Sequence, residues 1–266
     1  MLPPERPKKR GHDLQADQFD LHATIEDQHW WFVGRRHIIN KLVNEIVAPA
    51  GVIVDIGCGT GGNIGSLADK YECIGIDTSP EAIDLARKRF PETKFICGMA
   101  PDDLGEINDR ADLLLLLDVL EHIENDREFF QKIFGSLRPG AHILITVPAD
   151  MSLWSPHDVN YGHFRRYDAE QLKQVWSGLP ASLRLLSYFN TALYPVIKVV
   201  RAFNRIRNRE WGDAGTDLSL PPKIINSALT SIFGHEAKPL VSALRGKRAR
   251  RYGFGVSLVA VLQKDA

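Results

Sequence analysis

The feature that most constrains this chain is a glycine-rich stretch that directly follows a short apolar segment. Residues 54–63 read VDIGCGTGGN, and five glycines fall within residues 51–62. The segment 52–56 predicts a strand that ends at Gly57, and residues 63–70 predict the start of a helix. Because glycine adopts positive φ and lets a ligand approach the backbone closely, this arrangement predicts a ligand-binding loop at a helix N-terminus.

The spacing of the glycines limits the range of possible ligands only in part. Gly57, Gly59 and Gly62 satisfy the dinucleotide-binding fingerprint. That pattern alone does not separate a nicotinamide dinucleotide from another cofactor that contains adenosine.

Strands and helices alternate after this loop. Residues 111–118 form a nearly continuous apolar run, which is typical of a parallel strand buried on both faces. The pattern predicts a doubly wound α/β sheet, with ligands outside the carboxyl ends of its strands. Further strands are predicted at 71–76, 94–97, 142–147, 183–189 and 255–263, and helices at 80–89, 125–136 and from Asp168.

About sixty residues separate the last two predicted strands, which is too long for a plain connection. They include an amphipathic stretch at 194–207. We therefore expect residues 191–254 to form a helical substrate cap. The core of the fold would comprise residues 21–190 and 255–266, with lid helices at its N-terminal end, after a disordered arm at 1–20.

Composition limits the setting in which the chain works. Three cysteines lie in or beside apolar segments without metal-binding spacing, as is typical of reduced, structural thiols. The N-terminal residues MLPPERPKKRGH lack the apolar region of a signal peptide, and no stretch approaches a transmembrane span. These features predict a cytoplasmic protein.

Charge is unevenly distributed along the chain, although the net charge is zero. Residues 161–266 hold 17 Lys and Arg against 7 Asp and Glu, and residues 1–160 hold the other 16 against 26. A basic second half suggests an anionic ligand, substrate or surface, unless the two halves neutralise each other in the fold.

Taken in order, these residues resemble the class I S-adenosylmethionine-dependent methyltransferases over roughly residues 50–150. Asp55, Gly57, Gly59 and Gly61 match the first motif of that family. In nicotinamide proteins the position of the acid is usually apolar. The other matching segments are Asp77 after the second strand, Gly98-Met99-Ala100 after the third, Asp118-Val-Leu-Glu121-His122 after the fourth, and Leu137-Arg-Pro-Gly140 before the fifth.

The resemblance implies a Rossmann-like sheet of seven strands with an antiparallel last strand. It also implies S-adenosylmethionine as the methyl donor and S-adenosylhomocysteine as the product. Asp55 would organise the loop and the amino-acid end of the cofactor, Asp77 would accept from the ribose hydroxyls, and Met99 would pack on the adenine. The fourth-strand motif would face the sulfonium through Asp118 and the substrate through Glu121 and His122.

Two further stretches resemble segments of a bacterial subgroup of these enzymes. The first, residues 26–36, reads EDQHWWFVGRR. It would form a lid in which Trp30 or Trp31 covers the cofactor and Arg35 or Arg36 binds its carboxylate. The alternative is an N-terminal helix that docks its aromatic side chains into the core.

The second stretch, residues 154–167, follows the fifth strand, where a substrate should enter. His157 or His163 would serve as a general base, and Arg165 or Arg166 would hold an anionic group. Arg166 and Tyr167 also fit a structural role as loop anchors. No cysteine or third histidine has metal-ligand spacing here, so no metal site is predicted.

Together these patterns predict an S-adenosylmethionine-dependent methyltransferase that methylates an oxygen atom of an anionic small-molecule or lipid-linked acceptor. An NAD-linked oxidoreductase and a non-catalytic binding module are the alternatives. The basic cap would contact the acceptor or a membrane surface, or simply pack on the sheet. Nucleic acid is not expected, because the basic run at 245–251 lacks interleaved aromatics. The oligomeric state stays open.

Overall fold

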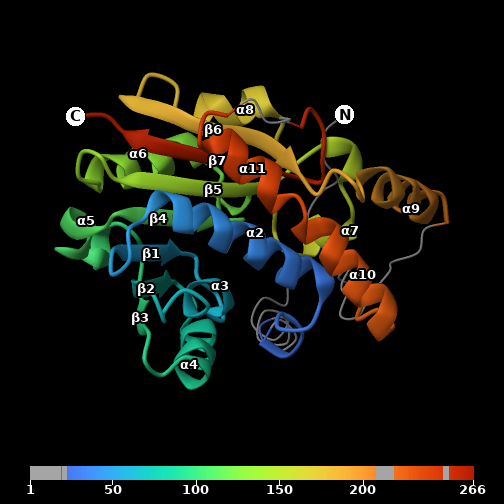
Figure 1. Ribbon diagram of the computed structural model, residues 1–266, viewed down its shortest axis with the longest axis horizontal. Coiled ribbons are helices and arrows are strands. Elements are labelled where there is room, and N and C mark those ends of the chain that lie inside the picture. Colours follow the sequence, from blue (N-terminus) through green and yellow to red (C-terminus); the bar gives the residue numbers. More distant parts are fainter. Residues whose placement is uncertain (1–18, 20–22, 208–218, 248–251) are drawn as a thin grey trace.

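A seven-stranded sheet forms the centre of the molecule, with helices on both faces (Figure 1). The computed structural model describes residue 19 and residues 23–207, 219–247 and 252–266. The strand order is β3-β2-β1-β4-β5-β7-β6. The strands are β1 (Val52–Ile56), β2 (Glu72–Asp77), β3 (Lys94–Cys97), β4 (Leu113–Leu117), β5 (His142–Pro148), β6 (Ala181–Phe189) and β7 (Ser257–Lys264).

The pairing confirms the predicted fold. Strands β1 to β5 pair in parallel, whereas β7 pairs antiparallel with both β5 and β6. Every residue of β1 and of β4 is buried, as expected for central strands covered on two faces. The strand order reverses beside β1, because β2 and β4 lie on opposite sides of it. This is the switch point at which doubly wound sheets bind ligands.

Two apolar layers cover the sheet. One contains buried residues of α2 (Trp30–Ile46), α3 (Gly62–Gly65) and α4 (Pro80–Arg89), and the other contains those of α6 (Asp126–Ser136) and α8 (Ala169–Val175). The short elements α5 (Ile107–Arg110), η1 (Asp102–Leu104), η2 (Leu120–His122), η3 (Met151–Leu153) and α7 (Pro156–Asn160) connect these parts.

Local sequence signals explain several helix boundaries. Ser79 accepts a hydrogen bond from Ala82 N–H at the start of α4, and Asp168 forms a capping box with Gln171 at the start of α8. Helix α3 is much shorter than the predicted 63–70, and it ends at Gly65, a residue with low helix propensity.

Between β6 and β7, the described residues form three helices: α9 (Tyr194–Arg207), α10 (Lys223–Gly234) and α11 (Ala237–Leu244). Helices α10 and α11 pack along α2, while α9 contacts η3. The buried carboxylate of Glu236, between α10 and α11, accepts hydrogen bonds from the backbone N–H groups of Asn190, Thr191 and Ala192. Glu236 therefore links residues 190–192, which precede α9, to the start of α11.

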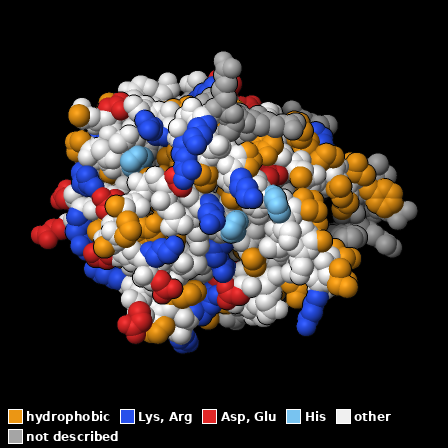
Figure 2. All heavy atoms as spheres, in the orientation of Figure 1, with side chains coloured by type: hydrophobic (Ala, Val, Ile, Leu, Met, Phe, Trp, Pro, Cys, Tyr) orange, Lys and Arg blue, Asp and Glu red, His pale blue; other side chains and the backbone are white. Residues whose placement is uncertain are grey.

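Helices α9 and α10 keep large apolar side chains in solvent. Figure 2 shows hydrophobic side chains gathered at the right-hand end of the molecule, over these two helices. The exposed residues there include Val196, Val199, Phe203, Ile224 and Ile225.

Two predictions fall partly or wholly on undescribed positions. The predicted arm at 1–20 lies outside the described residues except for Phe19, and part of the basic run at 245–251 lies outside them as well. Among the described residues, no helix combines the length and the apolar character needed to cross a membrane.

Candidate active site

The glycine loop lies at the carboxyl end of β1, as the sequence predicts. Gly57, Gly59 and Gly61 all have positive φ, of 71°, 53° and 83°. A Cβ atom at Gly57 or Gly61 would meet a neighbouring side chain, but one at Gly59 would have nothing within 4 Å. Gly59 therefore borders open space, whereas the other two glycines accommodate packed neighbours.

Asp55 is the acid of β1 and is almost completely buried, with 1% of its surface exposed. Neither of its carboxylate oxygens has a hydrogen-bond partner among the described residues. Burial raises its pKa to about 7, and the positive charge of Arg35 opposes that shift. A buried acceptor without a donor is a cost to the fold, and a ligand that donates hydrogen bonds would remove it.

Asp77 ends β2 and holds the turn that follows. Its Oδ2 accepts from Gly59 N–H at 2.9 Å, and its Oδ1 accepts from Ser79 N–H at 2.9 Å. The structure therefore brings Asp77 next to the glycine loop, as predicted. Its carboxylate stabilises the loop through these two hydrogen bonds.

Met99 follows β3, with 58% of its surface exposed. Its N–H donates to Asp103 Oδ2 at 2.7 Å, and a Cβ atom at Gly98 would collide with the same Asp103 side chain. Met99 is therefore largely exposed at this edge of the sheet.

Arg35 of α2 is buried against the end of β4. Its Nη2 lies 2.7 Å from Asp118 Oδ2 and donates to Thr146 Oγ1 at 3.0 Å. The guanidinium also lies over the ring of Trp31, 5.0 Å from its centroid. Its Nε has no partner among the described residues. Arg35 therefore joins Asp118 in the interior and keeps one unused donor.

The neighbouring residues of α2 have other partners. Arg36 pairs with Asp27 at 2.9 Å, so it points toward the N-terminal segment. Trp30 packs edge-on against Phe233 of α10. These contacts favour the docked-helix interpretation for Trp30 and Arg36, and they leave Trp31 and Arg35 as the pair nearest the site.

Glu26, in the N-terminal segment, contacts the glycine loop, and the sequence does not predict this contact. Glu26 is buried, and its Oε1 accepts from Thr60 Oγ1 at 3.0 Å and from Arg89. A Cβ atom at Gly62 would lie 2.5 Å from the Glu26 carboxylate. The contact joins residues more than thirty positions apart, so no local spacing indicates it. The only signal is an acid beside an aromatic motif.

Asp158 organises the loop after β5. It is fully buried, and its Oδ1 lies 3.0 Å from His163 Nδ1 and 2.8 Å from Arg166 Nε. Burial alone would raise the pKa of this carboxyl. The hydrogen bond from His163 and the charges of Arg166 and Arg201 outweigh burial and hold the pKa well below its usual range. Asp158 is therefore an anion that fixes three basic side chains.

The two predicted histidines differ in their surroundings. Burial lowers the pKa of His157 to about 3, so that imidazole is neutral and weakly basic at pH 7. His163 is oriented by Asp158, which leaves its Nε2 as the nitrogen that can face a ligand. Of the two, His163 is the one whose ring is fixed by a buried carboxylate.

Arg165, Arg166 and Tyr167 all have partners inside the fold. Arg165 pairs with Asp126 at 2.9 Å, and Arg166 also donates to the Ala149 carbonyl at 3.1 Å. The Tyr167 hydroxyl donates to Asp126 Oδ2 at 2.7 Å, and its ring belongs to the core. These contacts anchor the loop to β5 and α6.

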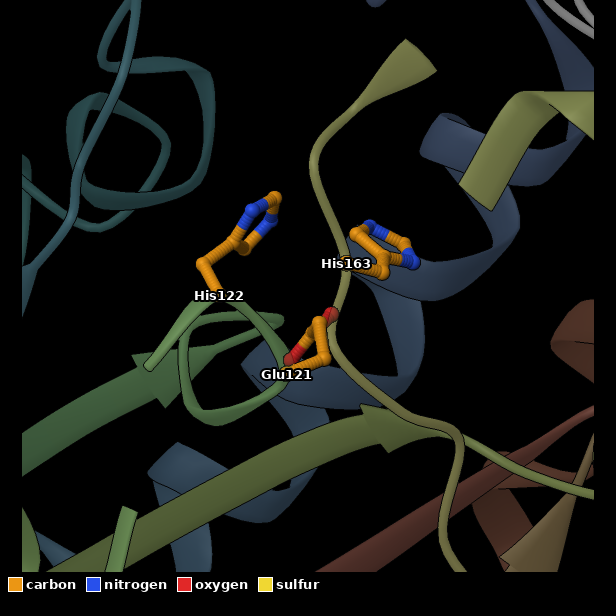
Figure 3. A group of neighbouring side chains, drawn as sticks. All are labelled: Glu121, His122 and His163. Atoms are coloured by element: carbon orange, nitrogen blue, oxygen red, sulfur yellow. The ribbon is translucent and has the colours of Figure 1, made fainter. Parts of the chain in front are cut away.

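Glu121, His122 and His163 meet at the carboxyl end of β4 (Figure 3). Glu121 is completely buried, and both of its carboxylate oxygens lack a hydrogen-bond partner among the described residues. Burial and the charge of Asp118 raise its pKa well above the usual range. His122 is exposed, and its ring lies edge-on to that of His163 at 4.6 Å between centroids.

Comparison with known proteins identifies one family. A family model described as a methyltransferase domain matches residues 29–190, which is more than half of the chain. The matched segment contains the glycine loop and every predicted site residue.

Two curated relatives match shorter stretches. A trans-aconitate 2-methyltransferase of Methylobacterium radiotolerans is 31% identical over 103 residues, covering 37% of this chain and 38% of the relative. A probable S-adenosylmethionine-dependent methyltransferase of Mycolicibacterium smegmatis is 24% identical, covering 57% of this chain and 59% of the relative. The matches thus span about 40–60% of these relatives' lengths.

Among solved structures, the plantazolicin methyltransferase BpumL in complex with S-adenosylhomocysteine has a TM-score of 0.57 and 16% identity, covering 96% of this chain and 92% of that chain. At this identity the likeness concerns the fold.

Proposed function

Because this chain belongs to the methyltransferase domain family, whose class I members use S-adenosylmethionine, we propose that it transfers a methyl group from that cofactor to an acceptor oxygen. The observation that carries the proposal is the buried, unpartnered carboxylate of Asp55 behind a glycine loop at the switch point of the sheet. The proposed site has a cofactor side, formed by residues 55–62 with Asp77, and an acceptor side, formed by Glu121, His122 and the loop 154–167.

The residues on the cofactor side fit the cofactor. Asp55 offers two acceptor oxygens to a cationic amino group, and the space beside Gly59 accommodates a ligand without a clash. Asp77 lies at the end of the neighbouring strand, where a carboxylate can accept from ribose hydroxyls. The unused Nε donor of Arg35 suits the carboxylate end of an amino acid.

Methyl transfer requires alignment of the acceptor with the donor more than it requires activation of the donor. When bound, the cofactor supplies a methyl group on a positively charged sulfur, which is already a strong electrophile. The protein then has to hold the acceptor oxygen in line with the carbon–sulfur bond and exclude water. Asp158 orients His163 toward the carboxyl end of β4, so we assign His163 the contact with the acceptor's hydroxyl or carboxyl group.

The acceptor is proposed to be anionic and either small or linked to a lipid. Helix α9 contributes Arg201, whose Nη1 lies 3.9 Å from Asp158 Oδ2, and Lys198, so cations line the loop that leads to His163. The exposed apolar residues of α9 and α10 favour an acceptor with an apolar portion, or contact with a membrane surface. A relative named for trans-aconitate favours a carboxylate.

The first experiment measures cofactor choice and turnover together. Calorimetry with S-adenosylhomocysteine should show binding to one site, and NAD should not bind. The protein is then supplied with radiolabelled S-adenosylmethionine and a panel of carboxylates and lipid-linked acids. Binding of NAD without binding of S-adenosylhomocysteine would contradict the proposal and would indicate an oxidoreductase. Binding of the cofactor without turnover on any acceptor would leave a non-catalytic module.

With an acceptor in hand, His163→Ala should lower kcat by roughly 10²–10⁴-fold, the range expected when a side chain that acts on the transferred proton is lost. Affinity for S-adenosylhomocysteine should be unchanged. His157→Ala is the matched comparison, because it removes a neighbouring histidine whose imidazole is a weak base. An equal loss in both variants would contradict the assignment of His163.

A further inference from the structure

Three side chains of types that bind metals converge on the acceptor side. One potential ligand atom each from Glu121, His122 and His163 lies within 4.8 Å of the other two (Figure 3). Glu121 and His122 lie about forty residues before His163 in the sequence. A backbone hydrogen bond joins the two segments, because Phe164 N–H donates to the Glu121 carbonyl at 2.7 Å. The convergence is therefore built into the backbone.

The Glu121 carboxylate indicates independently that a ligand is missing. It is completely buried, and neither oxygen has a hydrogen-bond partner among the described residues. In Figure 3 its carboxylate lies between the two chain segments that carry the imidazoles. A buried carboxylate without a partner is costly, and a bound cation compensates that cost.

His163 is held in the manner of a metal-binding histidine. Its Nδ1 lies 3.0 Å from Asp158 Oδ1, so Nε2 remains available as a ligand atom. Histidines that bind metals almost always donate their other ring N–H to a carboxylate or carbonyl, which fixes the ring and its tautomer. Asp158 is itself fixed by Arg166 Nε at 2.8 Å.

We propose that Glu121, His122 and His163 bind a divalent transition-metal ion. Two imidazoles and one carboxylate are a ligand set that suits zinc, iron and similar ions better than magnesium, which prefers an all-oxygen environment. Three protein ligands leave at least one coordination position open, as in catalytic metal sites.

The observed spacing requires only a small adjustment. Metal–ligand bonds of about 2.1 Å place tetrahedral ligands about 3.4 Å apart. Ligand atoms that lie up to 4.8 Å apart therefore have to approach one another by up to about 1.4 Å. His122 is the exposed member of the three and lies at the end of η2.

This inference rests on the proposed function and makes it more specific. The open position would bind the acceptor oxygen and, for a hydroxyl, lower its pKa so that the proton passes to water. The oxygen–methyl bond then forms as the sulfur–methyl bond breaks, which leaves neutral S-adenosylhomocysteine. In this arrangement His163 acts on the acceptor through the metal ion.

The test is metal binding by the full chain, without any acceptor. Protein treated with a chelator and then dialysed is titrated calorimetrically with ZnCl₂, MnCl₂ and MgCl₂. We expect one Zn²⁺ per chain, weaker Mn²⁺ and the weakest binding for Mg²⁺. Failure of Zn²⁺ to bind up to millimolar concentration, or a preference for Mg²⁺, would overturn the proposal.

Variants then identify the ligands. Glu121→Gln, His122→Ala and His163→Ala should each lower Zn²⁺ affinity by at least 10–100-fold, the loss seen when even indirect partners of metal sites are removed. His235→Ala, at the end of α10, is the control and should retain parental affinity. Parental Zn²⁺ binding in any of the first three variants would overturn this ligand set.

S-adenosylhomocysteine binding is measured on every variant, and far-ultraviolet circular dichroism verifies folding. Glu121→Gln keeps the shape of the side chain, so it tests the site even if an alanine variant unfolds. A parent that binds Zn²⁺ but not S-adenosylhomocysteine would refute the proposed function and not the metal site. The reverse result would refute the metal site alone.

Discussion

The cofactor side and the acceptor side occupy the same edge of the sheet but are assembled in different ways. On the cofactor side, one loop of consecutive residues, 55–62, supplies the glycines and the buried acid, and Asp77 closes it from the next strand. On the acceptor side, partners come from η2, the loop after β5, and α9. Most of the first side therefore comes from consecutive residues, whereas the second side depends on contacts between distant segments.

The buried aspartates of the two sides, Asp158 and Asp55, also differ in how their charges are satisfied. Asp158 on the acceptor side has His163, Arg166 and Arg201 around it. Asp55 on the cofactor side has no hydrogen-bond partner among the described residues. The loop after β5 is therefore held together by its own ion pairs, whereas the Asp55 carboxylate remains available to a ligand.

The largest effect is expected from breaking the ion pairs of the acceptor loop. Asp158→Ala leaves the guanidinium of Arg166 buried without its carboxylate, and such losses cost about 3–5 kcal/mol of unfolding free energy. Arg165→Ala is the matched control, because the Arg165 side chain is 33% exposed and an exposed pair contributes about 0–1 kcal/mol. Urea unfolding measures both.

If Asp158→Ala does not fold, Asp158→Asn serves in its place, since it keeps the shape and an acceptor oxygen and should be destabilised to an intermediate extent. Equal stability of the Asp158 and Arg165 variants would contradict the idea that internal ion pairs hold this loop.

A smaller effect concerns the pH dependence on the cofactor side. Burial places the pKa of Asp55 at about 7 in the free protein. A cationic amino group binds the ionised form, so below pH 7 binding must displace a proton. Affinity for S-adenosylhomocysteine should fall about tenfold for each pH unit below 7 and level off above it. Calorimetry across this pH range measures the slope.

Asp55→Asn removes the titrating group, so its affinity should be weaker at pH 8 and nearly independent of pH. An unchanged slope in this variant would assign the proton to another group and remove Asp55 from the cofactor side.

The smallest effect is expected at Trp31. If this residue covers the cofactor, acrylamide quenching of tryptophan fluorescence should decrease modestly when S-adenosylhomocysteine binds. Trp31→Phe should abolish the decrease, whereas Trp30→Phe should keep it, because Trp30 packs on Phe233. Quenching that is identical with and without the ligand would leave Trp31 as a packing residue.

The same contrast explains what the sequence could predict. The apolar runs and glycines specify strands β1 and β3 and helix α4 at the bounds observed, because these signals are local. The family and the seven-stranded fold are confirmed. The pairing of Glu26 with Thr60, and of Glu121 with His163, joins distant segments, so no spacing in the sequence could indicate it.

The proposed metal site illustrates what cannot be predicted from residue spacing in the sequence. The loop 154–167 contains two histidines and offers no third, so the sequence gives no reason to expect a metal there. His122 is supplied by a different strand end, and the buried Glu121 becomes visible as a partnerless carboxylate only when the fold is known. Burial and long-range contact are properties of the assembled core.

The most direct test of the central claim, that the glycine loop binds S-adenosylmethionine, compares two glycine variants by calorimetry. Gly59 and Gly140 both have positive φ, and a Cβ atom at either would meet nothing within 4 Å. Gly140 precedes the amino end of β5, whereas Gly59 follows the carboxyl end of β1. Valine therefore strains the backbone at both positions but enters the cofactor's space only at Gly59. We expect Gly59→Val to weaken S-adenosylhomocysteine binding by at least about 100-fold, or about 2.8 kcal/mol, and Gly140→Val to bind like the parent. Equal affinity in the two variants would contradict the account.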